Sequence, residues 1–366
     1  MNKKLISLVV GARPNFMKIA PIVRALKNNS DNFSYRIIHT GQHNNKEMND
    51  VFFRELEIPP PDVYLKGNGG THSEQTARIM IGFEQECVKS KPDIVLVVGD
   101  INSSMACAIV TKKMHIKLIH VEAGLRSGDR EMPEEINRIL IDSISDLLFV
   151  TEPTGLENLL FEGHSPDEIH YVGNVMIDNL FYQLKKMDNY DFSSLMSHSL
   201  KSSLDRYGVF TIHRPSNVDS YKVLERIIKS INEVSKILPI IFPVHPRTRL
   251  NIEKWKIKFD SNVHLITSLP YMEFLSVWKD SALVMTDSGG LQEETTALGV
   301  PCITLRNNTE RPITLELGTN HLVGSPPVGL LKLVNDILID TKNNITLPKY
   351  WDGKSADRIV QILVRN

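Results

Sequence analysis

IVLVVGD, residues 94–100, is the stretch of sequence that decides the fold. Apolar and mostly β-branched residues run without a break into a Gly–Asp turn, and a helical pattern begins directly after it. A nearly continuous apolar run is typical of a strand that is covered on both faces, as the strands of parallel sheets are. The stretch therefore predicts a buried parallel strand with a polar residue, Asp100, at its carboxyl end.

Similar apolar runs recur along the whole chain. The first half holds LISLVV, YRIIHT, KLIHVE and LLFVT, and the second half holds GVFTIH, PIIFPVH, NVHLIT, ALVMTD and PCITL. Helical periods lie between the runs, as in residues 71–89, where Ile79, Phe83 and Cys87 fall four apart. Alternating strands and helices with short connections predict an α/β protein with parallel, doubly wound sheets.

This rhythm of strands and helices breaks once, near the middle of the chain. Residues 185–203, KKMDNYDFSSLMSHSLKSS, are polar and serine-rich with little periodicity, which is typical of a linker. A chain of 366 residues also exceeds what one hydrophobic core usually serves. We therefore expect a Rossmann-like N-terminal domain over residues 1–190 and a Rossmann-like C-terminal domain over residues 191–366. The final segment, SADRIVQILVRN, predicts a closing helix that docks on one of the domains, with the N-terminal domain as a candidate.

Charge and hydropathy exclude several classes of protein. The formal net charge of −1 provides no long-range attraction to nucleic acid or to an anionic membrane surface. No segment reaches the roughly 18 consecutive apolar residues that a membrane span needs. The N-terminal run LISLVV is too short for a secretory signal, so we expect a cytoplasmic protein.

Cysteine and histidine spacings point away from disulfides and metals. Cys87, Cys107 and Cys302 lie far apart with no CxxC pair, and we expect them to be reduced core thiols. None of the twelve histidines forms HExxH or pairs with a cysteine at ligand spacing, so no metal site is expected.

Polar residues gather where the apolar runs end. Ligands of open parallel sheets bind beyond the carboxyl ends of the strands. The pattern predicts one cleft that draws on strand ends from both domains. The strand-end residues are Gly11–Arg13, Gly41–His43, Gly99–Asp100, His120–Glu122, His213–Arg214, His245–Arg247 and Asp287–Gly290.

One strand end is typical of an anion-binding turn. In VMTDSGGLQEE, Ser288, Gly289 and Gly290 precede a helix, whose N-terminus offers unpaired N–H groups and a positive dipole end. Glu293 and Glu294 are expected in the first turn of that helix, where acids also serve ordinary capping, so a merely well-capped helix remains an alternative.

Cationic residues follow several strands. Arg13 comes directly after the first strand and Lys18 lies five residues further on. His213 and His245 are each followed closely by an arginine, a pattern that favours a diphosphate clamp over two structural histidines. The sequence has no GxGxxG after the first strand and no P-loop, which disfavours NAD-dependent and ATP-dependent chemistry and predicts no cofactor.

Acidic residues collect around HVEAGLRSGDREMPEEINR, residues 120–138. We expect Asp100, Glu122 and either Glu134 or Glu135 to converge at the strand ends of the first domain. Carboxylates held together out of water raise each other's pKa and become proton carriers near neutral pH. Arg126 and Arg138 are expected to keep the remaining acids ionised, and the alternative is a solvated loop of surface ion pairs.

Taken together, these motifs resemble the non-hydrolysing UDP-N-acetylglucosamine 2-epimerases, which interconvert UDP-GlcNAc and UDP-ManNAc. The resemblance runs along nearly the whole chain. It rests on GARPNFMKIAPI, HTGQH, VVGDINS, HVEAGLRS, MPEEINR, GNVMID, IHRPSNVD, FPVHPRT, MTDSGGLQEE and GVPCITLRNNTERP.

The resemblance implies a fold like that of the GT-B glycosyltransferases, an active site in the interdomain cleft and no cofactor. It also implies a homodimer that acts on a UDP-sugar. In this family a base removes the hydrogen at carbon 2 while UDP leaves by anti elimination. The 2-acetamidoglucal is then reprotonated on its other face and UDP adds again.

The family motifs assign roles to individual residues of this chain. Asp100, Glu122 and Glu134 would be the acid/base carboxylates, and the motifs select Glu134 over Glu135. Arg138 would orient the acids or the sugar, and His213 would act at the diphosphate. The remaining substrate-binding residues would be Arg13, Lys18, His245, Phe274, Ser288, Gly289, Gly290, Glu294 and Arg311, with Glu294 at the ribose and Phe274 against the uracil.

The chain departs from common family patterns at GARPN, HRPSN, TERPI and QHNNKEM. The last lies where some bacterial members bind a second UDP-GlcNAc as activator. Alternatives within the fold are a 2-epimerase of a related sugar, such as a diacetamido uronate or a 6-deoxy sugar, a hydrolysing epimerase, and a retaining glycosyltransferase. A nucleotide-sugar sensor would keep the diphosphate residues but would not need the three acids.

Overall fold

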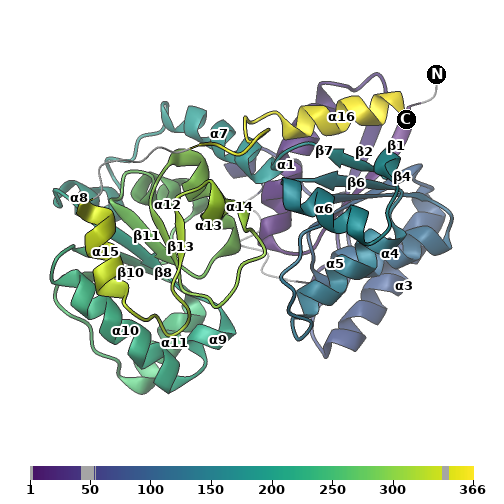
Figure 1. The fold of residues 1–366 in the computed structure, drawn as a ribbon. Coiled ribbons are helices and arrows are strands. Elements are labelled where there is room, and N and C mark those ends of the chain that lie inside the picture. The colour runs from purple at the N-terminus through teal and green to yellow at the C-terminus, as the bar shows by residue number, and fades with distance from the viewer. Residues whose placement is uncertain (1–2, 43–52, 54, 340–345) are drawn as a thin grey trace. The chain divides into compact units, whose positions relative to one another are not determined.

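The computed structural model describes residues 3–42, 53, 55–339 and 346–366, apart from the side chain of Arg13. The chain divides into two compact units, which we call unit 1, Met1–Tyr182 with Lys349–Asn366, and unit 2, Gln183–Pro348. Each unit is built on one parallel sheet with helices packed against it, so the predicted α/β class is confirmed (Figure 1). The C-terminal segment belongs to unit 1 although it follows unit 2 in the sequence.

Unit 1 is organised by a seven-stranded sheet whose strand order is β3-β2-β1-β4-β5-β6-β7. All neighbouring strands pair in parallel. The order reverses between β1 and β4, and such a reversal opens a crevice at the carboxyl ends of the two strands. The strands are β1 (Lys4–Val10), β2 (Phe33–His39), β3 (Val63–Tyr64), β4 (Ile94–Val98), β5 (Lys117–Ala123), β6 (Leu147–Val150) and β7 (Ile169–Tyr171).

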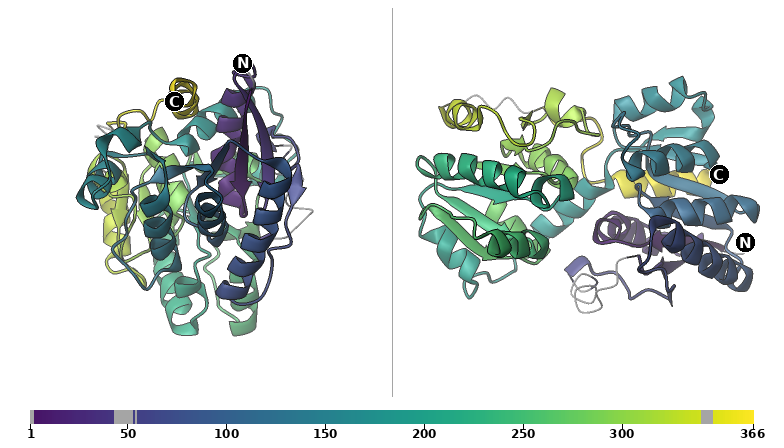
Figure 2. Two further views of the ribbon diagram at one scale, coloured as in Figure 1. Left: turned by 90° about the vertical axis from the view of Figure 1, so that its right-hand side faces the viewer. Right: turned by 90° about the horizontal axis from the view of Figure 1, so that it is seen from below.

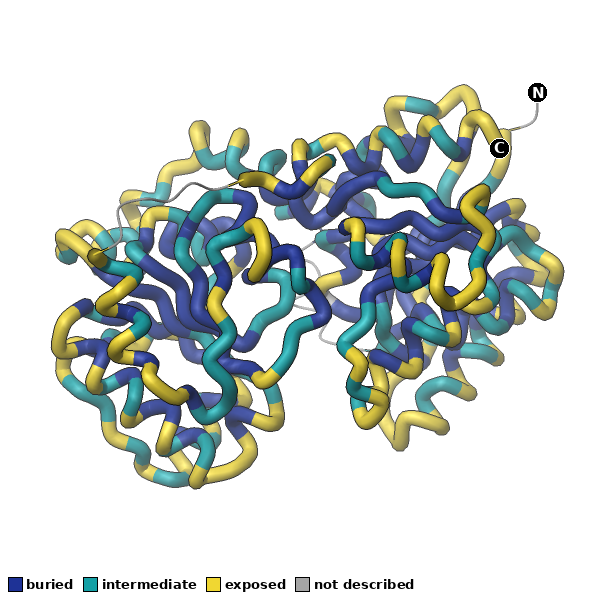
Figure 3. Tube along the Cα trace, viewed as in Figure 1, coloured by how far each residue is buried: buried dark blue, intermediate teal, exposed yellow. Residues whose placement is uncertain are grey.

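The stretch that predicted the fold is the fully buried strand β4 (Figure 3). Ile94, Leu96 and Val98 enter one hydrophobic core, while Val95 and Val97 enter another on the opposite face of the sheet. Helices α1 and α16 cover the first face, and α3 and α4 cover the second. The helices of unit 1 are α1 (Arg13–Lys27), α3 (His72–Ser90), α4 (Asn102–Lys113), α5 (Pro133–Ile144), α6 (Pro153–Phe161) and α16 (Ser355–Arg365), with a 3-10 turn at Pro166–Glu168.

Unit 2 repeats the same arrangement with six parallel strands in the order β10-β9-β8-β11-β12-β13. Its order reverses between β8 and β11. The strands are β8 (Gly208–Thr211), β9 (Ile240–Val244), β10 (Val263–Thr267), β11 (Leu283–Thr286), β12 (Cys302–Thr304) and β13 (Asn320–Leu322). The helices of its described residues from Met196 onward are α8 (Met196–Ser202), α9 (Pro215–Val218), α10 (Tyr221–Ser235), α11 (Pro246–Trp255), α12 (Tyr271–Trp278), α13 (Gly289–Leu298), α14 (Ile313–Glu316) and α15 (Leu330–Ile339).

The expected linker over residues 185–203 is partly helical, so that prediction was wrong in detail. Helix α7 (Val175–Met187) continues into it, and α8 (Met196–Ser202) forms within it. The short α8 is held by contacts with α12, because Lys201 Nζ donates to the Ser276 carbonyl at 2.8 Å and pairs with Asp280. Such tertiary contacts override a weak local pattern and are invisible in a window of sequence.

The closing helix α16 packs along α1 and shares its hydrophobic core (Figure 2). Its N-terminus is capped by Asp178 of α7, whose two carboxylate oxygens accept from Ser355 N at 3.0 Å and Ala356 N at 2.7 Å. Burial outweighs these hydrogen bonds and raises the pKa of Asp178 to about 6. The N-terminal N–H groups of a helix need such partners, so Asp178 fixes the returning chain to unit 1.

Replacing this cap should destabilise the fold in a pH-dependent way. Because the pKa of Asp178 is higher in the folded protein, the folded state holds its proton more tightly, and stability falls as pH rises from about 4 to about 6. We expect Asp178→Ala to lower the free energy of unfolding by about 1–2 kcal/mol and to remove this part of the pH dependence. Thermal unfolding of both proteins at several pH values measures both effects.

Asp357→Ala is the matched control, because Asp357 is an exposed acid in the first turn of the same helix. It should change stability by less than about 0.5 kcal/mol. Equal losses in the two variants would mean that Asp178 is not the cap that matters.

Candidate functional site

The strand order of unit 1 reverses where β1 and β4 end side by side, and Asn15 joins these two ends. Its side-chain oxygen accepts from Gly11 N and Ala12 N, and its amide nitrogen donates to the Val98 carbonyl at 3.0 Å. Asn15 is buried in the first turn of α1. The start of α1 is therefore fixed against the carboxyl end of β4.

Gly99 directly follows β4, and Glu122 lies near the end of the neighbouring strand β5, where Val98 pairs with Val121. Glu122 is buried and forms an ion pair with Lys18, which α1 brings from the other side of β4. Gly99 adopts a φ of +62°, and a Cβ there would lie 2.9 Å from Lys18 Nζ. Glycine at this position therefore leaves room for the lysine to reach the acid.

Asp100 is more accessible than Glu122, because 28% of its side chain is exposed. Arg138 of α5, which is buried, donates from Nε to Asp100 Oδ2 at 3.1 Å. Asn137 holds the backbone of the same residue by donating to the Asp100 carbonyl at 2.8 Å. Asp100 thus has a fixed main chain, an oriented carboxylate and access to solvent.

The structure separates the two adjacent glutamates of MPEEINR. Glu135 is buried, accepts from Ser127 N and Gly128 N at 2.9 Å each, and pairs with Arg138 Nη1 at 2.7 Å. Glu134, one residue earlier, is exposed at the start of α5. Glu135 is therefore engaged in holding the loop and the arginine, whereas Glu134 is accessible to a ligand.

In unit 2 the buried carboxylate of Asp287 organises the reversal point between β8 and β11. It accepts from His213 N at 3.1 Å, from Arg214 N at 2.9 Å and from Asn217 Nδ2 at 3.0 Å, and His213 Nδ1 lies 3.2 Å away. Burial raises the pKa of Asp287, but His213 and these hydrogen bonds outweigh it and lower the pKa overall. The ionised Asp287 holds His213 at the strand end, and the His213 side chain remains 42% exposed.

Helix α13 begins directly after Asp287. Ser288 is its N-cap residue without a side-chain cap hydrogen bond, and Ser288, Gly289 and Gly290 are all partly exposed. Arg311 approaches this helix start and pairs with Glu293 at 2.8 Å and with Glu310. A Cβ on Gly289 would lie 2.9 Å from Arg311 Nη1, so the glycine permits the approach. An anion at this N-terminus would meet backbone N–H groups beside a guanidinium.

Glu293 and Glu294 were expected in the first turn of α13, and this prediction was wrong. The helix starts at Gly289, so its first turn holds no acid and the two glutamates belong to the second turn. Glu294 is buried and accepts from the Tyr271 hydroxyl at 2.6 Å. Burial raises the pKa of Glu294 to about 8, although the Tyr271 hydrogen bond lowers it.

Phe274 lies on α12, one turn after Tyr271, and is partly rather than fully buried. His245 directly follows β9 and accepts at Nδ1 from Arg247 N at 3.3 Å. Its ring centroid lies 5.6 Å from that of His213. The two strand-end histidines are therefore neighbours, as the pattern of the sequence suggested.

The predicted residues divide into two groups, one in each unit. The group of unit 1 holds Lys18, Asp100, Glu122, Glu134 and Arg138, with Arg13 at the start of α1 and its side chain outside the described part of the chain. The group of unit 2 holds His213, His245, Phe274, Ser288, Gly289, Gly290, Glu294 and Arg311.

One expected contact of Arg126 does not form among the described residues, and three residues that support the two groups were not singled out from the sequence. Arg126 was expected to meet the acids of the site, but it pairs with Asp142 and Glu162 instead. Asn15 and Tyr271 were not singled out, although Asn15 stands within GARPN. Asp142 was also missed, although it follows Glu135 and Arg138 at the i, i+3, i+7 spacing of one helix face. The stretch QHNNKEM lies outside the described residues from His43 onward.

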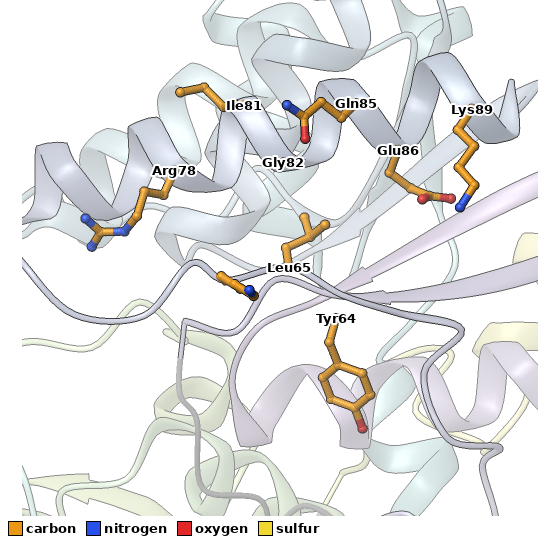
Figure 4. A pocket seen from close by; sticks show the side chains of 9 residues that line it. Tyr64, Leu65, Arg78, Ile81, Gly82, Gln85, Glu86 and Lys89 are labelled. Carbon is orange, nitrogen blue, oxygen red and sulfur yellow. The ribbon is translucent and has the colours of Figure 1, made fainter.

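A separate open groove of about 510 Å³ lies on unit 1 between α3 and the chain that follows β3 (Figure 4). Tyr64, Leu65 and Lys66 form one side, and Arg78, Ile81 and other residues of α3 form the other. None of the predicted site residues lines it.

Residues 3–42, 53, 55–339 and 346–366 contain no group of three or more His, Cys, Asp or Glu side chains that could hold a metal ion. They also contain no helix that is long and apolar enough to cross a membrane. Cys87, Cys107 and Cys302 are buried and unpaired, as predicted.

Two Rossmann-like units, with paired acids at the strand ends of one and a helix N-terminus beside arginine in the other, define an enzyme of the GT-B-like nucleotide-sugar class. The chain matches the UDP-N-acetylglucosamine 2-epimerase family over residues 24–364. It belongs to that family of isomerases.

Relatives of this family are similar to the chain over nearly its whole length. The UDP-N-acetylglucosamine 2-epimerase of Methanocaldococcus jannaschii is 43% identical over 364 residues, which cover 98% of each chain. The UDP-2,3-diacetamido-2,3-dideoxy-D-glucuronate 2-epimerase of Pseudomonas aeruginosa is 36% identical, also over 98% of each chain. The crystal structure of the M. jannaschii enzyme in complex with UDP-GlcNAc and UDP has a TM-score of 0.89 at 42% identity and covers 99% of this chain and 100% of that chain.

The two adjacent glutamates should respond differently to loss of their charge. Glu135→Gln removes a buried acceptor from two N–H groups and from Arg138, so we expect a loss of about 2–4 kcal/mol in the free energy of unfolding. Glu134→Gln should change that energy by less than about 0.5 kcal/mol, because Glu134 is exposed. Denaturant titration of both variants gives the comparison, and a larger loss for Glu134→Gln would contradict the separation of their roles.

Proposed function

We propose that the protein interconverts UDP-GlcNAc and UDP-ManNAc by inverting carbon 2 of the sugar. The observation that carries this proposal is the pair of carboxylates at the ends of β4 and β5, each paired with a cation from a helix. Asp100 and Glu122 lie at the carboxyl ends of neighbouring strands, which suits two acids that act on one carbon atom. Membership of the family and the relative that was crystallised with UDP-GlcNAc support the same substrate class.

The reaction proceeds by elimination and addition in this proposal. A carboxylate takes the hydrogen at carbon 2 as a proton, the carbon 1–oxygen bond to UDP breaks, and a double bond forms between carbons 1 and 2. An acid then returns a proton to carbon 2 on the opposite face while a UDP oxygen re-forms the bond to carbon 1. No electrons are gained or lost overall, so the reaction needs no redox cofactor.

Unit 1 supplies the proton carriers in this mechanism. Asp100, Glu122 and Glu134 serve as acid and base, and the exposure of Glu134 and Asp100 suits contact with the sugar. Arg138 orients Asp100 through the 3.1 Å hydrogen bond and remains positively charged beside it. Lys18 balances the charge of Glu122, and Arg13 contributes to the diphosphate site.

Unit 2 binds the leaving group. The N-terminus of α13 with Ser288, Gly289 and Gly290 receives the diphosphate, together with Arg311, His213 and His245. These groups stabilise the negative charge that develops on UDP as the bond to carbon 1 breaks. His213 is held by Asp287 and can donate to the departing oxygen. Glu294 accepts from the ribose hydroxyls, and Phe274 lies against the uracil.

Relatives of this chain carry the names of epimerases for different sugars. The P. aeruginosa relative at 36% identity carries the name of a diacetamido glucuronate epimerase, which favours one specific alternative substrate. A hydrolysing epimerase would differ only in that water intercepts the glucal. A glycosyltransferase or a nucleotide-sugar sensor would have less use for three acids at the strand ends.

Proton NMR in heavy water tests the proposed reaction directly. With UDP-GlcNAc we expect UDP-ManNAc to appear with deuterium at carbon 2. Asp100→Asn should lower the rate by at least about 100-fold and leave UDP affinity, measured by calorimetry, nearly unchanged, because the carboxylate acts on the sugar and not on the diphosphate.

Other outcomes of this experiment select other functions. Free ManNAc and UDP would indicate a hydrolase. Absence of exchange with UDP-GlcNAc, but exchange with a UDP-diacetamido uronate, would move the substrate to that sugar. A loss of UDP binding in Asp100→Asn as large as the loss of rate would remove Asp100 from the acid/base role.

We also propose that the enzyme acts as a cytoplasmic homodimer. Helix α5 exposes Ile136 and Leu140, at 40% and 42%, and α3 exposes Ile81 and Val88, at 59% and 61%. Both helices pack beside α4, so these apolar side chains belong to one helical layer of unit 1. The three reduced thiols suit a reducing compartment.

Light scattering after size-exclusion chromatography should give twice the chain mass of 41.4 kDa. Ile81→Glu combined with Leu140→Glu should reduce the mass to that of a single chain, since burying two charges in an apolar interface is costly. Leu250→Glu, at a site 68% exposed on α11 of unit 2, is the matched control and should leave the mass unchanged. A single-chain mass for the wild type at micromolar concentration would exclude the dimer.

A further inference from the structure

The backbone at Glu122 is held in a conformation that its own side chain disfavours. Glu122 has a φ of +75°, and the pairing of β5 with β6 is irregular between Val121 and Ala123. A residue other than glycine in this region costs on the order of 1–3 kcal/mol and persists only when its surroundings impose it. The structure must therefore contain groups that hold this segment from both sides.

A single buried carboxylate, Asp142 of α5, supplies that hold. Its Oδ1 lies 2.6 Å from His120 Nδ1, two residues before Glu122. Its Oδ2 accepts from Gly124 N at 3.0 Å, two residues after Glu122, and from Arg126 Nη1 at 2.8 Å. The two oxygens thus bracket Glu122 along the chain.

His120 extends the hold to the neighbouring strand. Its ring is fully buried, and its Nε2 lies 3.1 Å from the carbonyl oxygen of Gly99, the residue before Asp100. Both ring nitrogens therefore face oxygen acceptors, one on Asp142 and one on Gly99. A neutral imidazole donates to only one of them, whereas an imidazolium donates to both.

The charges of this cluster balance within it. Arg126 is a cation, His120 becomes one when both ring nitrogens carry a proton, and Asp142 and Glu162 are the anions. Arg126 donates to both Glu162 oxygens, at 2.8 Å and 2.6 Å. Burial raises the pKa of Asp142, but His120 and Arg126 outweigh it and lower the pKa overall. A buried ion pair of this kind seldom adds more stability than apolar residues of the same volume. A requirement to fix the backbone on both sides of Glu122 accounts better for this buried cluster.

We propose that His120 and Asp142 are positioning residues that set the separation and orientation of the two carboxylates, Asp100 and Glu122. His120 ties the end of β4 to the end of β5, and Asp142 fixes the strained backbone on both sides of Glu122. Both side chains are fully buried and act through the carboxylates, without touching substrate. The inference rests on the proposed function, because it assigns these residues to the geometry of that reaction.

Two amide variants of His120 each keep one of its two contacts and remove the other. In His120→Asn the amide nitrogen takes the place of Nδ1 and can donate to Asp142, but the contact with Gly99 is lost. In His120→Gln the amide nitrogen takes the place of Nε2 and can donate to Gly99, but the contact with Asp142 is lost. His170→Gln on β7 is the matched control, since His170 lies in the same sheet and away from both carboxylates.

We expect each His120 variant to lose about 10- to 100-fold in kcat, because misplacement of reacting groups by about 1 Å costs this much. The KM for UDP-GlcNAc and the affinity for UDP should stay within about two-fold of wild type, and His170→Gln should keep wild-type kcat. Circular dichroism and thermal unfolding confirm that the compared variants are folded. Unchanged kcat in a folded His120 variant, or a rise in KM at constant kcat, would overturn the inference.

Nitrogen NMR of the histidine rings tests the same inference without any activity. In wild-type protein labelled with ¹⁵N-histidine, both ring nitrogens of His120 should give the shifts of protonated nitrogen, assigned by their loss in His120→Asn. Shifts of a neutral ring would overturn the inference. Wild-type protein that binds UDP but exchanges no hydrogen at carbon 2 with any UDP-2-acetamido sugar would instead overturn the proposed function, whatever the state of the ring.

Discussion

Parallel pairing of β4 with β1 on one side and with β5 on the other is the constraint on which the rest of unit 1 depends. A parallel sheet brings every carboxyl end to one edge, so the residues after β1, β4 and β5 must be neighbours however far apart they are in sequence. The start of α1, Asp100 and Glu122 meet for this reason. Unit 2 obeys the same rule, because β11 pairs with β8 and brings the start of α13 to His213.

Helix α5 buries mostly polar and charged side chains, because it lies against the ends of the strands. Its buried residues are Glu135, Asn137, Arg138, Ile141 and Asp142, of which only Ile141 is apolar. An ordinary surface helix buries an apolar stripe and exposes a polar one. Because α5 lies against strand ends, its inner face must satisfy backbone N–H and carbonyl groups that the sheet leaves unpaired, and charged side chains do this where apolar ones would not.

The sequence predicted most of the fold because its signals were local and repeated. The continuous apolar run of β4 and the spacing of Ile79, Phe83 and Cys87 need no knowledge of the rest of the chain. The sequence did not predict helix α8, because contacts with α12 hold it. It did not predict the cap of α16 either, because Asp178 and Ser355 lie 177 positions apart in sequence. Strand-end position selected Asp100 and Glu122 as candidates, and the family motifs selected Glu134 over Glu135. The opposite burial of these two adjacent glutamates is visible only in the structure.

Asp142 illustrates why the supporting residues of a site are harder to read than the residues at its surface. An acid within the apolar pattern ILIDSI is visible in the sequence, but its partners, His120, Gly124 and Arg126, come from a strand and a loop that α5 meets only after folding. Once folded, the carboxylate is excluded from water, so its charge must be met by fixed donors at short range. Those same donors flank Glu122. The requirement to satisfy one buried charge and the requirement to hold a strained acid are thus met by one set of hydrogen bonds.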